Sequence, residues 1–130
     1  MIYLDSCVLI YATERDDHLG QQVRGRLEIT SEDVILSPLV EMECLVKPLR
    51  DGNYALRDAY RRTFAQYRSF EPDHGVYHRA AELRAGFGLK SVDAIHLAMA
   101  QLAGCDALWT NDDRLAKASG GLAVNILRAS

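Results

Sequence analysis

Residues 1–12 read MIYLDSCVLIYA, and they predict the first repeating unit of the fold. Ile2-Tyr3-Leu4 is a short apolar run, which is typical of a strand covered on both faces in a parallel sheet. Asp5 ends the run, and Ser6 can cap a following apolar helix. The amino terminus therefore predicts a strand, an acidic residue at its carboxyl end, and then a helix.

Two more apolar runs resemble the first, at Val34–Leu36 and Ala107–Trp109, and weaker patterns predict short strands at Ser69–Glu71 and Ala123–Leu127. Ser37-Pro38 follows one run, and a Ser before a Pro is typical of a helix start. Helices are predicted from Ser6, within Asp16–Leu27, across Leu39–Leu49 and 54–69, at Val76–Ala85, from a Ser91 cap to Leu102, and at Leu115–Ala118. Strands that alternate with helices predict an α/β domain with a mainly parallel sheet.

Composition is that of an ordinary globular chain, with 48% hydrophobic and 25% charged residues among 130. This length predicts a single domain over residues 1–130. The three cysteines, Cys7, Cys44 and Cys105, lie in apolar runs and form no CxxC motif, so we expect buried free thiols and a reducing, cytoplasmic location. The sequence shows neither a basic leader nor a long apolar stretch, so we expect neither a signal peptide nor a membrane span.

Charge is unevenly distributed along the chain. The formal net charge is −3, but the segment from Lys47 to Lys90 holds nine basic and five acidic residues. Two interpretations stay open: solvated helix faces with incidental charge, or a surface that weakly attracts phosphate groups.

Four acidic residues follow the predicted strands or lie near helix starts. Asp5 and Asp112 come just after strands, whereas Glu43 and Asp93 follow the helix-start residues at 37 and 91. The carboxyl ends of parallel strands share the edge at which such folds bind ligands, so we expect the four to gather there. Clustered carboxylates repel one another, and a hard divalent cation relieves the conflict, which favours Mg²⁺ or Mn²⁺ and phosphodiester hydrolysis.

Three of the four acids also have a purely structural interpretation. Asp5 could cap a helix, Asp93 could interact with a helix dipole, and Asp112 could form an Asx turn. All four on one edge is less readily explained in this way than any one alone.

The motifs around these acids resemble those of a known family. They are Asp5-Ser6-Cys7-Val8-Leu9, Ser37 followed by Glu43, SVDAIHLA at 91–98 and Trp109-Thr110-Asn111-Asp112. From residue 1 to about residue 126 the chain resembles PIN domains, and within them the VapC toxins of VapBC toxin–antitoxin pairs. The resemblance implies a three-layer α/β/α fold with strand order 3-2-1-4-5. It also implies an endoribonuclease dependent on Mg²⁺ or Mn²⁺, usually homodimeric and inhibited by an antitoxin.

The resemblance also implies roles for individual residues. Asp5, Glu43, Asp93 and Asp112 would form the catalytic metal site, with Ser6 and Thr110 orienting ligands or water beside it. Asp113 is a weaker candidate for the site, and Glu41 is expected to be solvated on another helix face. His96 could share a face with Asp93, but a packed, hydrogen-bonded histidine is the favoured interpretation.

The expected reaction is in-line attack of water on an RNA phosphodiester, leaving a 5′-phosphate and a 3′-hydroxyl. Arg61, Arg62 and Lys90 are candidates to hold the RNA backbone, and the helix pair at 54–85 to carry antitoxin or dimer contacts. The aromatic stripe of the first of these helices, at positions 56, 60, 64 and 67, is expected in the core or in a partner contact.

Three alternatives remain. One is a catalytically silent PIN-like module that binds RNA or protein. Another is a receiver-like signalling domain, which would need a lysine just after a late strand; Lys117 lies several residues past that point. The third is a small-molecule phosphohydrolase, which the absence of a Gly-rich phosphate loop disfavours.

Overall fold

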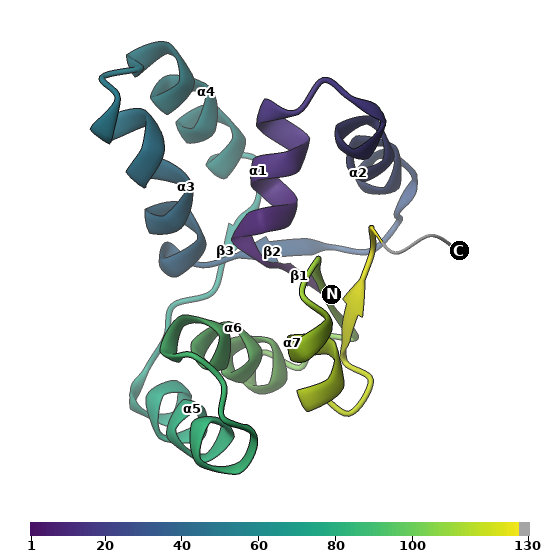
Figure 1. Cartoon of the computed structure of the whole chain (residues 1–130), viewed down its shortest axis with the longest axis vertical. Coiled ribbons are helices and arrows are strands. Elements are labelled where there is room, and N and C mark those ends of the chain that lie inside the picture. The colour runs from purple at the N-terminus through teal and green to yellow at the C-terminus, as the bar shows by residue number, and fades with distance from the viewer. Residues whose placement is uncertain (128–130) are drawn as a thin grey trace.

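The computed structural model describes residues 1–127, in which strands and helices alternate (Figure 1). In chain order the elements are β1 (Ile2–Leu4), α1 (Ser6–Glu14), α2 (His18–Ile29), β2 (Val34–Leu36), α3 (Pro38–Arg50), α4 (Tyr54–Phe64), β3 (Arg68–Ser69), α5 (His74–Phe87), α6 (Ser91–Leu102), β4 (Ala107–Thr110), α7 (Asp113–Ala118) and β5 (Ala123–Asn125).

The five strands form one sheet in the order β3-β2-β1-β4-β5, and every neighbouring pair is parallel. The expected α/β class and strand order are thereby confirmed. In the central strand Tyr3 pairs with Ile35 on one side and with Leu108 on the other. Because all strands run the same way, the residues after β1, β2 and β4 meet at one edge of the sheet.

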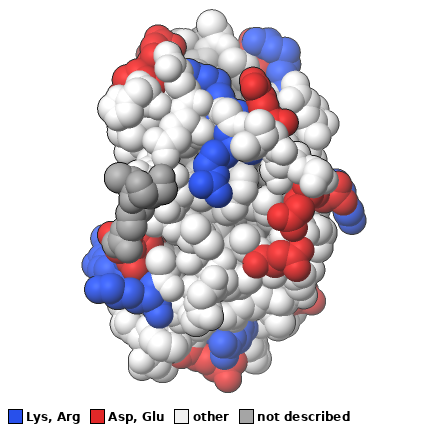
Figure 2. All heavy atoms as spheres, turned by 90° about the vertical axis from the view of Figure 1, so that its right-hand side faces the viewer, with Lys and Arg blue, Asp and Glu red and all other residues white. Residues whose placement is uncertain are grey.

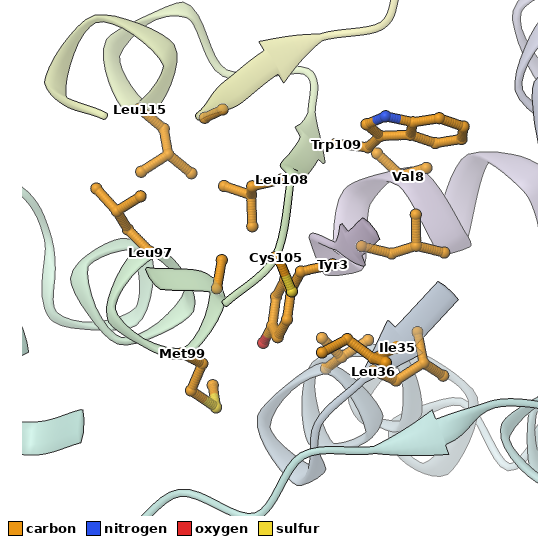
Figure 3. Packing of buried hydrophobic residues seen from close by; sticks show 14 of the residues in the cluster. Tyr3, Val8, Ile35, Leu36, Leu97, Met99, Cys105, Leu108, Trp109 and Leu115 are labelled. Carbon is orange, nitrogen blue, oxygen red and sulfur yellow. The ribbon is translucent and has the colours of Figure 1, made fainter. Parts of the chain in front are cut away.

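Helices cover both faces of the sheet, as a three-layer arrangement requires. Figure 1 shows α1 to α4 on one side and α5 and α6 on the other, with α7 beside β5. Figure 3 shows Tyr3, Ile35 and Leu108 from three neighbouring strands in one cluster with Leu97 and Met99 of α6. All five are buried, so the middle of the sheet is the centre of the hydrophobic core.

Helix boundaries differ from the sequence prediction around residues 64–75. The helix predicted over 54–69 ends at Phe64, and the chain then turns so that Arg68–Ser69 can pair with β2 as the edge strand. The short strand predicted at Ser69–Glu71 therefore begins one residue earlier and ends two residues earlier. The helix α5 begins at His74, earlier than predicted, because the side chain of Asp73 accepts a hydrogen bond from the Val76 amide.

Two of the three predicted serine caps are wrong. The Ser37 hydroxyl accepts a hydrogen bond from the Val40 amide and caps α3 as predicted. Ser6 and Ser91 are instead the first residues inside α1 and α6, and the N-cap residues Asp5 and Lys90 make no side-chain cap bond. The Ser6 hydroxyl donates to the Asp5 carboxylate at the end of β1 and does not cap α1.

The aromatic stripe of α4 belongs to the core. Tyr60 is fully buried, and Leu56, Phe64 and Tyr67 pack partly buried against the same cluster. Of the two interpretations left open for this stripe, the core contact is the one observed. Within residues 1–127, no helix has the length and apolar character needed to cross a membrane.

All three cysteines are free thiols, as expected. Cys44 and Cys105 are buried, whereas Cys7 is only partly buried.

Candidate functional site

Asp5 is held rigidly where β1 ends. Its amide donates to the Trp109 carbonyl at 2.9 Å, which extends the pairing of β1 with β4 by one residue. Thr110 donates its hydroxyl hydrogen to one carboxylate oxygen at 2.8 Å, and Ser6 approaches the other at 3.4 Å. Asp5 as a whole is only 7% exposed, so these two hydroxyls fix the orientation of its carboxylate. Ser6 and Thr110, predicted as supporting residues, both contact Asp5.

Glu43 lies in the second turn of α3 and points back over the sheet edge. A carboxylate oxygen of Glu43 lies 2.5 Å from Nε2 of His96, a fully buried residue of α6. Nδ1 of the same ring lies 2.7 Å from the Tyr3 hydroxyl, which is 2.7 Å from the Ser37 hydroxyl. A buried chain of hydrogen bonds therefore joins Glu43 to the middle of the sheet.

The direction of this chain follows from the acceptor at its end. An ionised carboxylate only accepts, so Nε2 of His96 carries a hydrogen and donates it to Glu43. With a neutral ring, Nδ1 is then an acceptor, and the Tyr3 hydroxyl donates to it while accepting from Ser37. Burial raises the pKa of Tyr3, which keeps this hydroxyl protonated.

Three groups form the tightest part of the site. One ligand atom each from Asp5, Glu43 and His96 lie within 4.8 Å of one another. Nε2 of His96 is 3.8 Å from the nearer Asp5 oxygen. Because this nitrogen already donates to Glu43, we interpret His96 as the residue that positions the carboxylates and not as a ligand.

Asp93, in the first turn of α6, faces the same acids. Burial raises the pKa of its carboxyl group, and the charges of Asp5, Asp112 and Glu43 raise it further, while His96 lowers it. The shift shows that the four predicted acids share one electrostatic neighbourhood. Ionising all of them together costs free energy unless positive charge is present.

Asp112 has two roles in the structure. Its side chain accepts from the Arg114 amide at 2.9 Å and caps α7, so the local structural interpretation of this residue is correct. Its charge also acts on Asp93, so capping does not remove it from the cluster. The neighbouring Asp113 accepts instead from the Asn125 side chain at 3.0 Å, toward β5.

The donor set fits a hard divalent cation. The converging atoms are carboxylate oxygens, and the one nitrogen among them is committed to a hydrogen bond. Oxygen ligands with several negative charges suit Mg²⁺ or Mn²⁺ better than zinc. A cation at this position would also offset the repulsion from the neighbouring acids, which adds to the effect of burial on the pKa of Asp93.

Comparison with known proteins agrees with this fold. The family model described as the PIN domain matches residues 2–121. The chain belongs to the PIN domain family. A curated relative, Ribonuclease VapC46 of Mycobacterium tuberculosis, is 34% identical over 134 residues, covering 99% of this chain and 98% of its own length. The resemblance to VapC proteins found in the sequence is thereby confirmed.

Solved structures show the same PIN fold at low sequence identity. A chain from a toxin–antitoxin complex of Klebsiella pneumoniae superposes with a TM-score of 0.81 at 22% identity, over 97% of this chain and 98% of that one. VapC20 of M. tuberculosis, a toxin described as cleaving the sarcin-ricin loop, gives 0.77 at 16% identity, over 91% and 95%.

The three basic residues predicted to hold the RNA backbone lie at two separate places in this PIN domain. Lys90 lines a cavity whose wall includes Asp93. Arg61 and Arg62 lie in the last turn of α4, on the opposite side of the sheet from α5 and α6 (Figure 1). Sequence reasoning had no means to separate them, because all three occur in the same basic segment.

Proposed function

We propose that this PIN domain is a Mg²⁺- or Mn²⁺-dependent endoribonuclease and the toxin component of a type II toxin–antitoxin pair. The observation that carries the proposal is that Asp5 and Glu43 offer ligand atoms within 4.8 Å of one another at the carboxyl edge of the sheet. The nearby Asp93 is close enough that, after burial, the charges of Asp5, Asp112 and Glu43 raise its pKa. Such a cluster is unfavourable in a protein that binds nothing there. It becomes useful when a cation bridges it to a phosphate.

A bound divalent cation would make water more acidic and stabilise the charge that develops on the phosphate. The protein's part is to hold the carboxylates in fixed positions. Thr110 and Ser6 hold Asp5, and His96 holds Glu43. Asp93 and Asp112, both partly exposed, would complete the site on the solvent side, where a substrate phosphate can enter.

RNA is the proposed substrate because the relatives point to it. The 34% identical relative is named a ribonuclease, and VapC20 is described as a toxin that cleaves the sarcin-ricin loop. In this chain the same reaction would leave a 5′-phosphate and a 3′-hydroxyl.

A homodimer and an antitoxin are the proposed protein partners. The likeness to a chain of a toxin–antitoxin complex supports the second of these. Exposed apolar side chains at Met42, Val46 and Leu49 lie at helical spacing on α3 and give a surface that a partner could cover. Co-purification with the product of an adjacent small open reading frame would test the antitoxin.

The direct test is cleavage of a structured RNA pool by the purified protein. Reactions with Mg²⁺, Mn²⁺ and EDTA are compared for the wild type, Asp5→Asn and Asp93→Asn. We expect cutting with either cation and none in EDTA, with a loss of about 100-fold or more in each variant. End-group analysis should find a 5′-phosphate on the downstream product.

Glu41→Gln is the matched control, because it removes an acid from the first turn of α3 without touching the cluster. It should cut like the wild type. Cutting that survives EDTA, or that Glu41→Gln loses as fully as Asp5→Asn, would contradict the proposed site. Tight RNA binding without cutting on a wide range of RNAs would favour the silent binding module instead.

A further inference from the structure

A second feature of the active-site edge is a cavity of about 250 Å³ next to Asp93. It lies where the end of α5, the start of α6 and the helix α7 meet. Its walls include Phe87, Lys90, Asp93, Arg114 and Lys117. The acid cluster therefore continues directly into a cavity that carries three basic side chains.

The three cations reach the cavity from two separate elements. Lys90 is the N-cap residue of α6, whereas Arg114 and Lys117 belong to α7. The guanidinium of Arg114 is 3.9 Å from Asp112 at a largely exposed position, so it is only loosely held there. Positive charge from both sides of one cavity, beside a cluster of carboxylates, suits a ligand that carries phosphate.

Local placement of these cations matters because the chain as a whole is acidic. The net charge is −3. Figure 2 shows that on one face the charged side chains of the described residues lie in small groups, many of them with basic and acidic residues side by side, and with neutral surface between the groups. A polyanion approaching the acid cluster would be repelled unless cations lie next to it. The cavity supplies them at that point.

The aromatic ring of Phe87 gives the cavity an apolar wall. Phe87 is 58% exposed at the end of α5. Gly88 follows it with φ of +67°, a left-handed conformation that closes the helix and sends the chain directly into Leu89 and Lys90. The turn therefore places Phe87 and Lys90 in the wall of the same cavity.

An exposed aromatic ring beside cations is the arrangement with which proteins bind unpaired nucleotides. The base stacks on the ring, and the cations contact the backbone phosphate. The cavity is smaller than the roughly 300–1,000 Å³ typical of pockets for drug-sized ligands, so one nucleotide is the ligand that its size favours.

We propose that this cavity holds one unpaired nucleotide of the RNA substrate, next to the bond that is cut. Its base stacks on Phe87, and its phosphate contacts Lys90, Arg114 and Lys117. The inference rests on the proposed ribonuclease function and adds to it the residues that would hold the substrate beside the cleaved bond: Phe87 for the base, and Lys90, Arg114 and Lys117 for the phosphate.

The test measures RNA binding separately from cutting. Fluorescence anisotropy follows a labelled single-stranded RNA of about ten nucleotides of mixed sequence with the Asp5→Asn protein in Mg²⁺, across about 50 to 200 mM salt. Lys90→Ala/Lys117→Ala in this background should weaken binding roughly tenfold. It should also lower the slope of log affinity against log salt by about 1.4, which corresponds to two phosphate contacts on a single strand.

Phe87→Leu separates stacking from charge. It should weaken binding about fivefold or more and leave the salt slope unchanged, because no charge is removed. A duplex of the same sequence should bind more weakly than the single strand and be insensitive to Phe87→Leu. Thermal melts check that these exposed substitutions leave the fold intact.

Arg61→Ala/Arg62→Ala is the matched control, because it removes the same charge from α4. Equal losses in the two double variants, an unchanged affinity in Phe87→Leu, or no RNA binding at low salt would each overturn the proposed cavity. Failure of the wild type to cut RNA, with these binding differences present, would overturn the ribonuclease proposal and leave the nucleotide site standing.

Discussion

His96 joins the core of the molecule to its acidic edge. Both ring nitrogens have partners, and the ring is fully buried 53 positions along the chain from Glu43, the carboxylate that it contacts. The expectation of a packed, hydrogen-bonded histidine is confirmed. Its contact with Glu43 could not be predicted, because it depends on how α3 and α6 lie across the sheet and not on any local pattern.

Tyr3→Phe tests whether this chain of hydrogen bonds stabilises the protein. The substitution removes the hydroxyl that joins Ser37 to His96 and leaves the buried Nδ1 without its partner. We expect the free energy of unfolding in urea to fall by about 1–3 kcal/mol. Less well fixed carboxylates should also lower RNA cleavage.

Tyr77→Phe is the control for Tyr3→Phe, because it makes the same chemical change at an exposed position of α5. It should unfold within about 0.5 kcal/mol of the wild type. Equal midpoints for the two variants would show that the buried hydroxyl contributes nothing.

The individual acids differ in how well the sequence predicts them. Asp5 and Asp112 follow apolar strands, so parallel topology alone brings them to one edge. Glu43 and Asp93 depend on the orientation of helices, and for them the family resemblance carried more than the spacing did. Metal binding by the four remains a prediction for the cleavage experiments.

At the scale of elements, the two strands β1 and β2 are predicted to the residue, whereas the helix α4 is not. The bounds of β1 and β2 match the apolar runs, because a buried parallel strand needs apolar residues on both faces. The helix α4 is shorter than its periodic pattern, because the chain must turn at residues 65–67 to place β3 beside β2. Such a turn is imposed by tertiary pairing, which a helical pattern does not contain.

The start of α2 gives a pH-dependent prediction. Asp17 caps the helix by accepting from the Gly20 amide and pairs with Arg15. The Arg15 guanidinium, followed by the Gly20 amide, lowers the pKa of Asp17 from 3.8 to about 2. A lowered pKa means that the folded state favours the ionised carboxylate, so this stabilisation is present above about pH 4 and is lost as the pH falls toward 2.

Asp17→Asn isolates the charge, since asparagine can still cap the helix. Urea midpoints of the wild type and the variant should differ at pH 5–7, with the wild type more stable, and should converge as the pH falls from about 4 to about 2. A gap that stays constant over this range would show that the Arg15 pair does not titrate as the structure implies.

At the scale of the whole molecule, the hydrophobic core stabilises the fold, whereas the acids at one edge of the sheet destabilise it. The core beneath it is closely packed, with Tyr3, Leu108 and Leu97 buried in one cluster. Above it the acids share one edge, where burial first and then the charges of Asp5, Asp112 and Glu43 raise the pKa of Asp93. Stability of the metal-free protein is therefore lower than the core alone would give.

Thermal melting should reveal this cost and its relief. Mg²⁺ or Mn²⁺ at about 100 times its dissociation constant should stabilise the protein by about 2.7 kcal/mol and raise the melting temperature by roughly 10 °C. Asp93→Asn removes one of the repelling charges and one proposed ligand. It should therefore melt at or above the wild type in EDTA, yet below it in saturating metal.

The controls are a distant acid and a monovalent salt. Glu41→Gln should respond to metal like the wild type, and NaCl of equal ionic strength should not reproduce the effect. Two results would contradict this prediction: Asp93→Asn melting below the wild type in EDTA, or NaCl raising the melting temperature as much as the divalent cation does. Either would mean that the fold holds the acids at this edge without strain, and the case for a metal between them would fail.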